Sequence, residues 1–269
     1  MRERQLDLFS GGGVWPEASS PPKAGRAPAD PAALDDNALI AAIPEASFDL
    51  AQGLVSEASR RGLIAAVPAL ERLCFRLKGF GLDRAVPEQV AALHALAEIG
   101  GAEAAKAVSR ILCQDAAQGP TLAVAMAAAA RLGVVLPEEK AASFLRHADP
   151  AVRADACRCA PFRPTAVAVL GELLHDLNAG AATAAACALG RMGQAEARPA
   201  LLRQLRQAPT AEVIEAISEV ACDEAIVLLG RVARSDDGLA RQAFEALEGI
   251  DSSRARRLVE ILAVQGHTG

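Results

Sequence analysis

Apolar residues along the chain follow helical spacing from residue 36 onward, and they form a repeating pattern. An alanine-rich segment with the same spacing lies between successive pairs of large apolar residues, at 122–132, 151–160, 181–192, 212–221 and 239–247. Each unit is therefore predicted to form two helices, one with a leucine face and one with an alanine face. Because one such pair cannot bury its apolar face alone, the units are expected to stack. The pairs recur every 27 to 33 residues: Ile111-Leu112, Phe144-Leu145, Leu173-Leu174, Leu201-Leu202, Leu228-Leu229 and Ile261-Leu262.

Turn-forming residues fall between these predicted helices. Asp149 before Pro150 predicts an N-cap followed by proline at the first helical position. Three residues stand near the equivalent place in later units: Asn178, Thr210 and Asp236. Glycines fall where helices are expected to end, because glycine adopts the left-handed conformation that closes a helix: Gly133, Gly190, Gly193 and Gly249.

Two stretches carry a family resemblance. The run Asp-Pro-Ala-Val-Arg-Ala-Asp-Ala at 149–156 and the run Ala-Leu-Gly-Arg-Met-Gly at 188–193 resemble short HEAT-like repeats of about thirty residues. The resemblance spans about residues 87 to 265 and implies an all-α fold, an α-solenoid of HEAT-like helical hairpins. We expect three parts: a disordered N-terminal leash at 1–34, an irregular helical cap at 35–86 and the solenoid at 87–269. A turn is predicted at residues 78–81, Lys-Gly-Phe-Gly.

The N-terminal leash carries a short motif. Residues 1–34 are rich in Gly, Pro, Ser and Ala, a composition that cannot pack a core. An apolar and aromatic pentapeptide in such a leash is typical of a segment that orders on a partner. The pentapeptide resembles the motif with which bacterial replication and repair proteins dock on the β sliding clamp, and it matches at all five positions: Gln5, Leu6, Asp7, Leu8 and Phe9.

The resemblance implies that Leu8 and Phe9 are the anchors, with Leu6 a secondary apolar contact and Gln5 a polar one. The alternative is a first helical turn packed on the domain, since Leu6 and Phe9 are three residues apart. Trp15 is either a second contact with the partner or an incidental linker residue. As a flexible coil of about 25 residues, the rest of the leash would span roughly 25 to 30 Å.

Composition and charge restrict the function classes. The chain has 269 residues, of which 52% are hydrophobic but only 3% aromatic, and the net charge of −5 argues against nucleic-acid binding through overall charge. Six cysteines without paired spacing are typical of reduced thiols in a cytoplasmic protein. The longest apolar stretch, 121–136, contains Arg131 and is too short to cross a bilayer, so no membrane association is expected.

Enzymatic motifs are missing from the sequence. No Gly-x-x-x-x-Gly-Lys phosphate loop occurs, and none of the four histidines precedes a glutamate. Cys157 and Cys159 lie two apart on one predicted helix, so their side chains diverge by about 200° and cannot share a metal. We therefore expect no cofactor and no metal, with the cysteines acting as small buried apolar residues.

Arginines recur after the large apolar pairs. Stacking would align them at one edge of the solenoid as a stripe for an anionic partner: Arg146, Arg203, Arg206, Arg231 and Arg234, with His175 at the matching place. The alternative is that cations stand near helix C-termini because the helix dipole favours them there. Residues 195–269 hold nine Lys/Arg against twelve Asp/Glu, so the charge along this part of the sequence is balanced.

Together these features predict a non-enzymatic protein–protein interaction adaptor. Its motif would tether the solenoid to the sliding clamp in DNA replication or repair, and its repeats would bind an unidentified second protein. Direct DNA binding is not expected. The alternatives are a generic HEAT-repeat scaffold with an accidental motif, or a HEAT-like enzyme or repair factor of the lyase or glycosylase type. Both of those activities favour aromatic walls, whereas the chain has no tyrosine and Trp15 is its single tryptophan.

Overall fold

The computed structural model describes residues 30–235 and 238–266, and all regular structure in this part of the chain is helical. The N-terminal limb contains α1 Asp36–Ala42, α2 Phe48–Arg60, α3 Val67–Arg76, α4 Pro87–Ile99, α5 Gly101–Cys113 and α6 Pro120–Arg131. The crown contains α7 Glu138–Leu145, α8 Pro150–Arg158, α9 Pro164–Leu173 and α10 Ala179–Arg191. The C-terminal limb contains α11 Arg198–Gln207, α12 Ala211–Glu219, α13 Asp223–Val232, α14 Ala240–Gly249 and α15 Ser253–Gly266. Three short 3-10 helices, Pro31–Ala33, Ile64–Ala66 and Ala195–Ala197, precede α1, α3 and α11.

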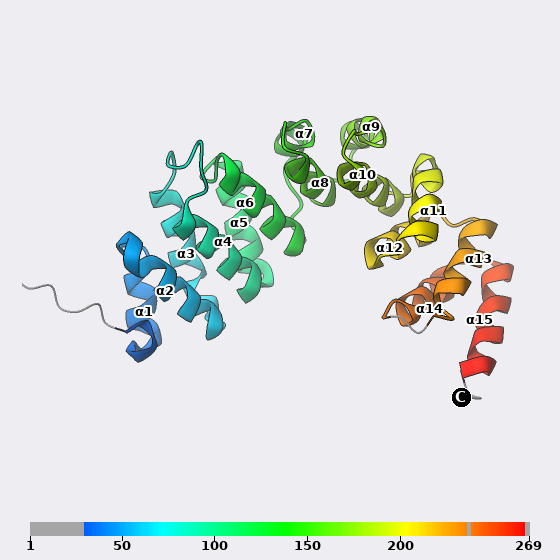
Figure 1. Ribbon diagram of the computed structural model, residues 1–269, viewed down its shortest axis with the longest axis horizontal. Coiled ribbons are helices and arrows are strands. Elements are labelled where there is room, and N and C mark those ends of the chain that lie inside the picture. Colours follow the sequence, from blue (N-terminus) through cyan, green and yellow to red (C-terminus); the bar gives the residue numbers. More distant parts are fainter. Residues whose placement is uncertain (1–29, 236–237, 267–269) are drawn as a thin grey trace, which may run out of the picture.

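The helices stack in two rows that follow an arch (Figure 1). Even-numbered helices from α2 to α14 pack on one another as the inner row. The odd-numbered helices from α3 to α15 pack against them from outside, and each odd helix from α3 to α13 forms a hairpin with the even helix that follows it. The chain is therefore the predicted α-solenoid of HEAT-like helical hairpins, with each hairpin burying its apolar face against the next.

The two rows differ in side-chain size, as the repeat pattern predicts. Inner helices carry the alanine-rich segments, and α10 buries four consecutive small side chains, Ala184, Ala185, Ala186 and Cys187. The paired large apolar residues lie on the outer helices α5 to α15, except that Leu174 directly follows α9. In five of these pairs both side chains are buried or half-buried, whereas Ile261 on the last helix is 51% exposed.

The predicted caps bind backbone amides at the start of the inner helices. Asp149 Oδ1 accepts from the Ala151 amide at 2.8 Å, Asn178 Oδ1 from Ala181 at 3.1 Å and Thr210 Oγ1 from Val213 at 3.3 Å. Each acceptor satisfies an amide that has no partner within its own helix. The fourth predicted cap, Asp236, lies outside the described residues.

The glycines divide into two kinds. Gly133 (φ 65°) and Gly193 (φ 71°) follow α6 and α10 in the left-handed conformation, as predicted for helix ends. Gly190 instead lies inside α10, so its expected role as a helix stop is wrong. A Cβ placed on Gly190 would stand 2.7 Å from the Ala216 carbonyl oxygen and 2.8 Å from Leu201 Cδ1. Glycine is required there because α12 and α11 come too close for any side chain.

The stacking extends into the segment expected to form an irregular cap. Helix α2 packs on α4 in the inner row, and α3 packs on α5 in the outer row, so only α1 stands outside both rows. The predicted turn at 78–81 lies in the connection from α3 to α4, with Gly79 and Gly81 at positive φ. Buried Gln89 on α4 links α3 to the connection after α5, because its Nε2 donates to the Cys74 and Ala116 carbonyls, both at 2.8 Å.

Arg61 holds the first described residues on α2. Asp30 caps the short helix Pro31–Ala33, and the Arg61 guanidinium donates to the carbonyls of Ala32 (3.1 Å) and Leu34 (2.9 Å). Residues 30–34, which the sequence assigns to the leash, are therefore seated on the solenoid. Arg61 also pairs with the buried Glu57 at 2.6 Å, and Glu57 accepts from Arg60 as well. No helix in the described part of the chain is both long and apolar enough to cross a membrane.

Gly190→Ala should destabilise the protein by about 1–3 kcal/mol, since the new methyl group must displace the α12 backbone. Gly171→Ala is the matched control: Gly171 lies within α9, and a Cβ there meets no atom within 4 Å. That change should be neutral or stabilising by up to about 1 kcal/mol, because alanine favours the helix. Urea unfolding followed by circular dichroism measures both. Equal effects of the two changes would contradict the close contact at Gly190.

Glu57 should make the free energy of unfolding decrease as the pH falls. Hydrogen bonds from Arg60, and then from Arg61, lower the pKa of Glu57 from 4.5 to about 2. A lowered folded-state pKa gives stability that is complete above about pH 4.5 and is lost as the pH falls toward 2. In Glu57→Gln, the urea midpoint should therefore fall less between pH 6 and roughly pH 3 than in the wild type. Glu45→Gln, which removes an exposed carboxylate just before α2, should leave the wild-type acid dependence in place.

Candidate functional site

The concave side of the N-terminal limb carries a groove of about 400 Å³ between three successive inner helices. Its floor consists of small apolar side chains from α6, among them Ala123, Val124 and Ala127. Polar side chains line its rim, one or two from each helix: His94 and Glu98 from α4, Arg131 from α6 and Asp155 from α8. An apolar floor with a few polar groups around it is the usual form of a binding groove.

The sequence builds this groove through the repeat itself. Ala123 and Ala127 are four residues apart, as are His94 and Glu98, so each pair lies on one face of its helix. The α4 face is held from the preceding repeat, because Ser59 Oγ on α2 donates to Glu98 Oε2 at 2.5 Å. None of the four rim residues was predicted from the sequence as part of a site. The signal was present as polar residues at helical spacing within the alanine-rich helices.

Beyond the groove, a cluster of four charged side chains joins three inner helices. Arg158 on α8 pairs with Asp155 at 2.8 Å and with Glu212 on α12 at 3.0 Å, while Arg191 on α10 reaches Glu212 at 3.2 Å. Burial raises the pKa of Asp155, and the hydrogen bond from Arg158 opposes that shift. One carboxylate thus gathers arginines from two neighbouring repeats, which ties the crown to the C-terminal limb.

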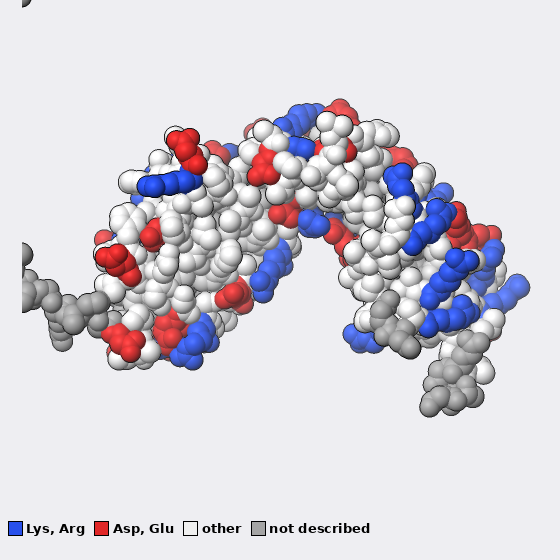
Figure 2. All heavy atoms as spheres, in the orientation of Figure 1, with Lys and Arg blue, Asp and Glu red and all other residues white. Residues whose placement is uncertain are grey.

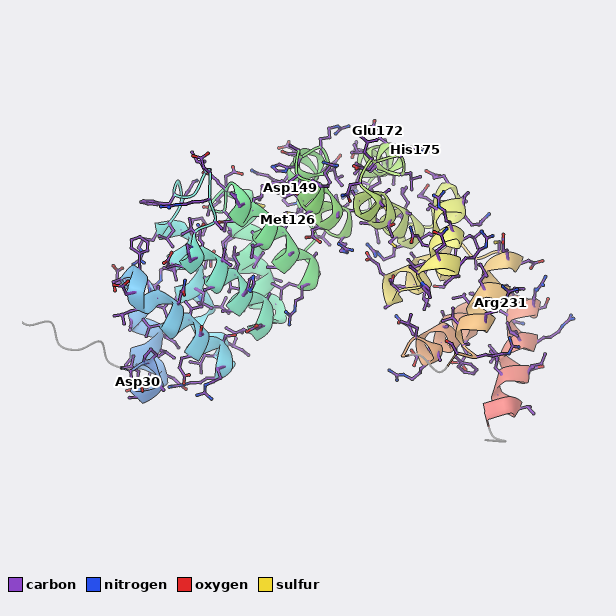
Figure 3. The ribbon with its side chains drawn as sticks, in the orientation of Figure 1. Asp30, Met126, Asp149, Glu172, His175 and Arg231 are labelled. Carbon is purple, nitrogen blue, oxygen red and sulfur yellow. The ribbon has the colours of Figure 1, made fainter. Side chains whose placement is uncertain are left out.

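The predicted arginine stripe is divided between the crown and the C-terminal limb. Arg146 lies at the crown and pairs with Glu172 on α9 at 3.7 Å. Figure 3 shows Glu172 beside His175, which follows α9, and both lie well away from Arg231. The rest of the stripe lies on α11, on α13 and in the turn after α13, where basic side chains cluster in Figure 2: Arg203, Arg206, Arg231 and Arg234. Arg206 pairs with Glu224. Arg234 donates to the Gly230 carbonyl at 3.0 Å, the helix-end placement expected of a cation.

The cysteines are mainly core residues. Cys74, Cys157, Cys159 and Cys187 are buried, and Cys113 and Cys222 are half-buried. Burial raises the pKa of each of the four buried thiols to about 12. Among the described residues, no three His, Cys, Asp or Glu side chains are placed to hold a metal ion together. The predicted clamp motif, Gln5 to Phe9, and Trp15 lie outside the part of the chain that the structure describes.

Comparison with known proteins identifies the repeats. A family model for HEAT repeats matches residues 138–221, which comprise the three hairpins from α7 to α12. A chain from the complex of CpcE and CpcF of phycocyanin lyase from Nostoc sp. PCC7120 superposes with a TM-score of 0.54 at 14% identity. The match covers 94% of this chain and 99% of that one. At this identity the similarity concerns the fold alone.

Two engineered proteins of known structure also resemble the chain. One has a TM-score of 0.42 at 18% identity and covers 84% of this chain and 71% of that one. The other has a TM-score of 0.36 at 17% identity, with coverage of 84% and 95%. No curated protein sequence matches the chain.

Cys187 should be inert in the folded protein. With a thiol pKa of about 12, only about one molecule in ten thousand carries the reactive thiolate at pH 8. We expect a disulfide reagent to label Cys113 and Cys222 first, and Cys187 only after unfolding. Cys187→Ala should cost about 1 kcal/mol or less, whereas Cys187→Arg should unfold its repeat by burying an unpaired charge. Rapid native labelling of Cys187 would place α10 at the surface and contradict the inner-row packing.

Proposed function

We propose that this protein is a non-enzymatic adaptor that brings a second protein to the bacterial sliding clamp during DNA replication or repair. The observation that carries the proposal is the pentapeptide Gln5-Leu6-Asp7-Leu8-Phe9, which agrees at every position with the clamp-docking motif. The motif ends 22 residues before Pro31, where the short first helix begins. Attachment to the clamp through this peptide would leave the whole arch available to another partner.

The concave groove between α4, α6 and α8 is the proposed surface for that second protein. Its floor consists of alanine and valine from the inner row of helices, and its rim offers both carboxylates and an arginine. Small side chains let a partner backbone come close, while rim charges fix its orientation. Repeat proteins bind through extended concave surfaces of this kind, which supports a scaffold over an enzyme.

Replacing both anchors should abolish clamp binding by the full-length protein. Leu8 and Phe9 each contribute about 1.5–3 kcal/mol when buried, so Leu8→Ala with Phe9→Ala should weaken binding at least about a hundredfold. Isothermal calorimetry with purified clamp measures this, and a peptide of residues 1–12 should bind in roughly the micromolar range.

Ser10→Ala is the matched control, because it alters the same segment outside the pentapeptide. Trp15→Ala tests the second contact and should reduce affinity modestly if the indole reaches the clamp. If the double variant binds the clamp as tightly as the wild type, the pentapeptide is accidental and the chain is a scaffold of another kind.

A further inference from the structure

Charges in the C-terminal limb are sorted between the two rows of helices. The inner helices α12 and α14 carry five glutamates and a single arginine, Arg241. The outer helices α11, α13 and α15 carry three carboxylates against seven arginines, and Arg234 follows α13 directly. The balance counted along the sequence therefore hides a basic outer face, visible over α11, α13 and α15 in Figure 2.

A groove of about 340 Å³ lies within that face, between α13 and α15. Its floor is aliphatic: Ile226 and Val227 come from α13, and Leu258 and Ile261 from α15. The helices meet closely at its base, because a Cβ on Gly230 would stand 2.5 Å from Leu258 Cδ2. Val227 and Ile261 remain 36% and 51% exposed, so the described residues leave this floor partly uncovered.

Four guanidinium groups surround the floor, and no carboxylate lines the groove. Arg231 and Arg234 come from the α13 side, and Arg254 and Arg257 from α15. Arg254 has a partner in Asp223 at 3.0 Å, an exposed pair at the N-terminal end of both helices. Arg231 and Arg257 form no ion pair among the described residues. Gathering like charges around one groove costs free energy, and an anionic ligand would turn that cost into attraction.

We propose that this groove binds an acidic amphipathic helix of a partner protein. The lining residues occupy positions 227 and 231 on α13, position 234 in the turn after α13, and positions 254, 258 and 261 on α15. Both sets follow helical spacing and form two ridges about 10 Å long, which is two turns of a helix laid between them. Aliphatic side chains of that helix would cover the floor, and its flanking carboxylates would reach the arginines.

The aliphatic floor decides between an acidic protein segment and nucleic acid. A nucleic-acid strand would use the arginines but offers its bases for stacking, and none of the eight lining residues is aromatic. An acidic amphipathic helix satisfies both the floor and the rim. This groove is on the outer face of the C-terminal limb, whereas the concave groove lies between α4, α6 and α8. The proposal does not depend on the clamp motif, so the peptide-binding site and the clamp-binding function can each be disproved separately.

The test uses the full-length protein and a fluorescein-labelled peptide of about fourteen residues, with leucines at i, i+4 and i+7 and glutamates beside them. Anisotropy should show saturable binding below about 100 μM that weakens as salt rises. A peptide with the same composition but scattered leucines should bind at least about fivefold more weakly, because it cannot cover the floor.

Charge reversal locates the site. Arg231→Glu with Arg257→Glu should weaken the leucine–glutamate peptide by at least about tenfold, and Ile261→Ser by about threefold to fivefold. Arg241→Glu is the matched control, since that side chain is 89% exposed on the inner helix α14, and it should change affinity less than about twofold. Circular dichroism melts check folding, and Arg231→Gln with Arg257→Gln replaces the reversal if that variant is unfolded.

Two results would overturn the proposal. One is failure of the peptide to bind, or binding that both arginine variants leave unchanged. The other is submicromolar, salt-sensitive binding of a 20-base-pair DNA duplex that is lost on reversal of Arg231 and Arg257 while the peptide binds weakly or not at all. That second result would make the outer face a nucleic-acid surface.

Discussion

Close packing of small side chains along the inner row is the constraint on which the rest of the structure depends. Buried alanines on α10, and Gly190 against the Ala216 carbonyl, let the inner helices approach until backbone meets backbone. Leucines and isoleucines keep the outer helices farther apart. Each repeat is therefore a wedge, narrow inside and wide outside, and stacked wedges bend the chain into the arch of Figure 1. The concave groove exists because the arch curves, and its floor is the surface of the same alanine-rich helices.

Arginine side chains link neighbouring repeats. Arg153 donates to the His147 and Ala148 carbonyls while pairing with Asp176 at 2.7 Å, which joins the turn before α8 to the turn before α10. Arg198 donates to the Val220 carbonyl, and Arg76 to that of Ala46, each at the end of a neighbouring helix or turn. These guanidinium groups satisfy carbonyls that the turns leave without helical partners. Packing sets the curvature, and these hydrogen bonds fix the repeats in register.

The periodic features of the sequence predicted the fold well, because the same apolar spacing and the same turn residues recur in several repeats. Alternating leucine and alanine helices, the caps at Asp149, Asn178 and Thr210, and the helix ends at Gly133 and Gly193 all follow from local rules. Gly190 was misjudged because the reason for that glycine is Ala216, a residue on another helix. The rim of the groove and the basic outer face were missed for the same reason. His94, Arg131 and Asp155 lie far apart in sequence, and a count of charges along the chain averages over helices that face opposite sides.

Segregated charge gives the C-terminal limb a transverse electric dipole that its net charge conceals. Glutamates on α12 and α14 mark the negative side, and the arginines of α11, α13 and α15 mark the positive side. Such a dipole orients the protein relative to a charged partner before the two come into contact. The partner's field exerts a torque on the dipole at distances of about a Debye length. An acidic protein would meet the convex flank first and a basic one the inner flank. Two partners of opposite charge would thus arrive on opposite sides without competing for the same surface.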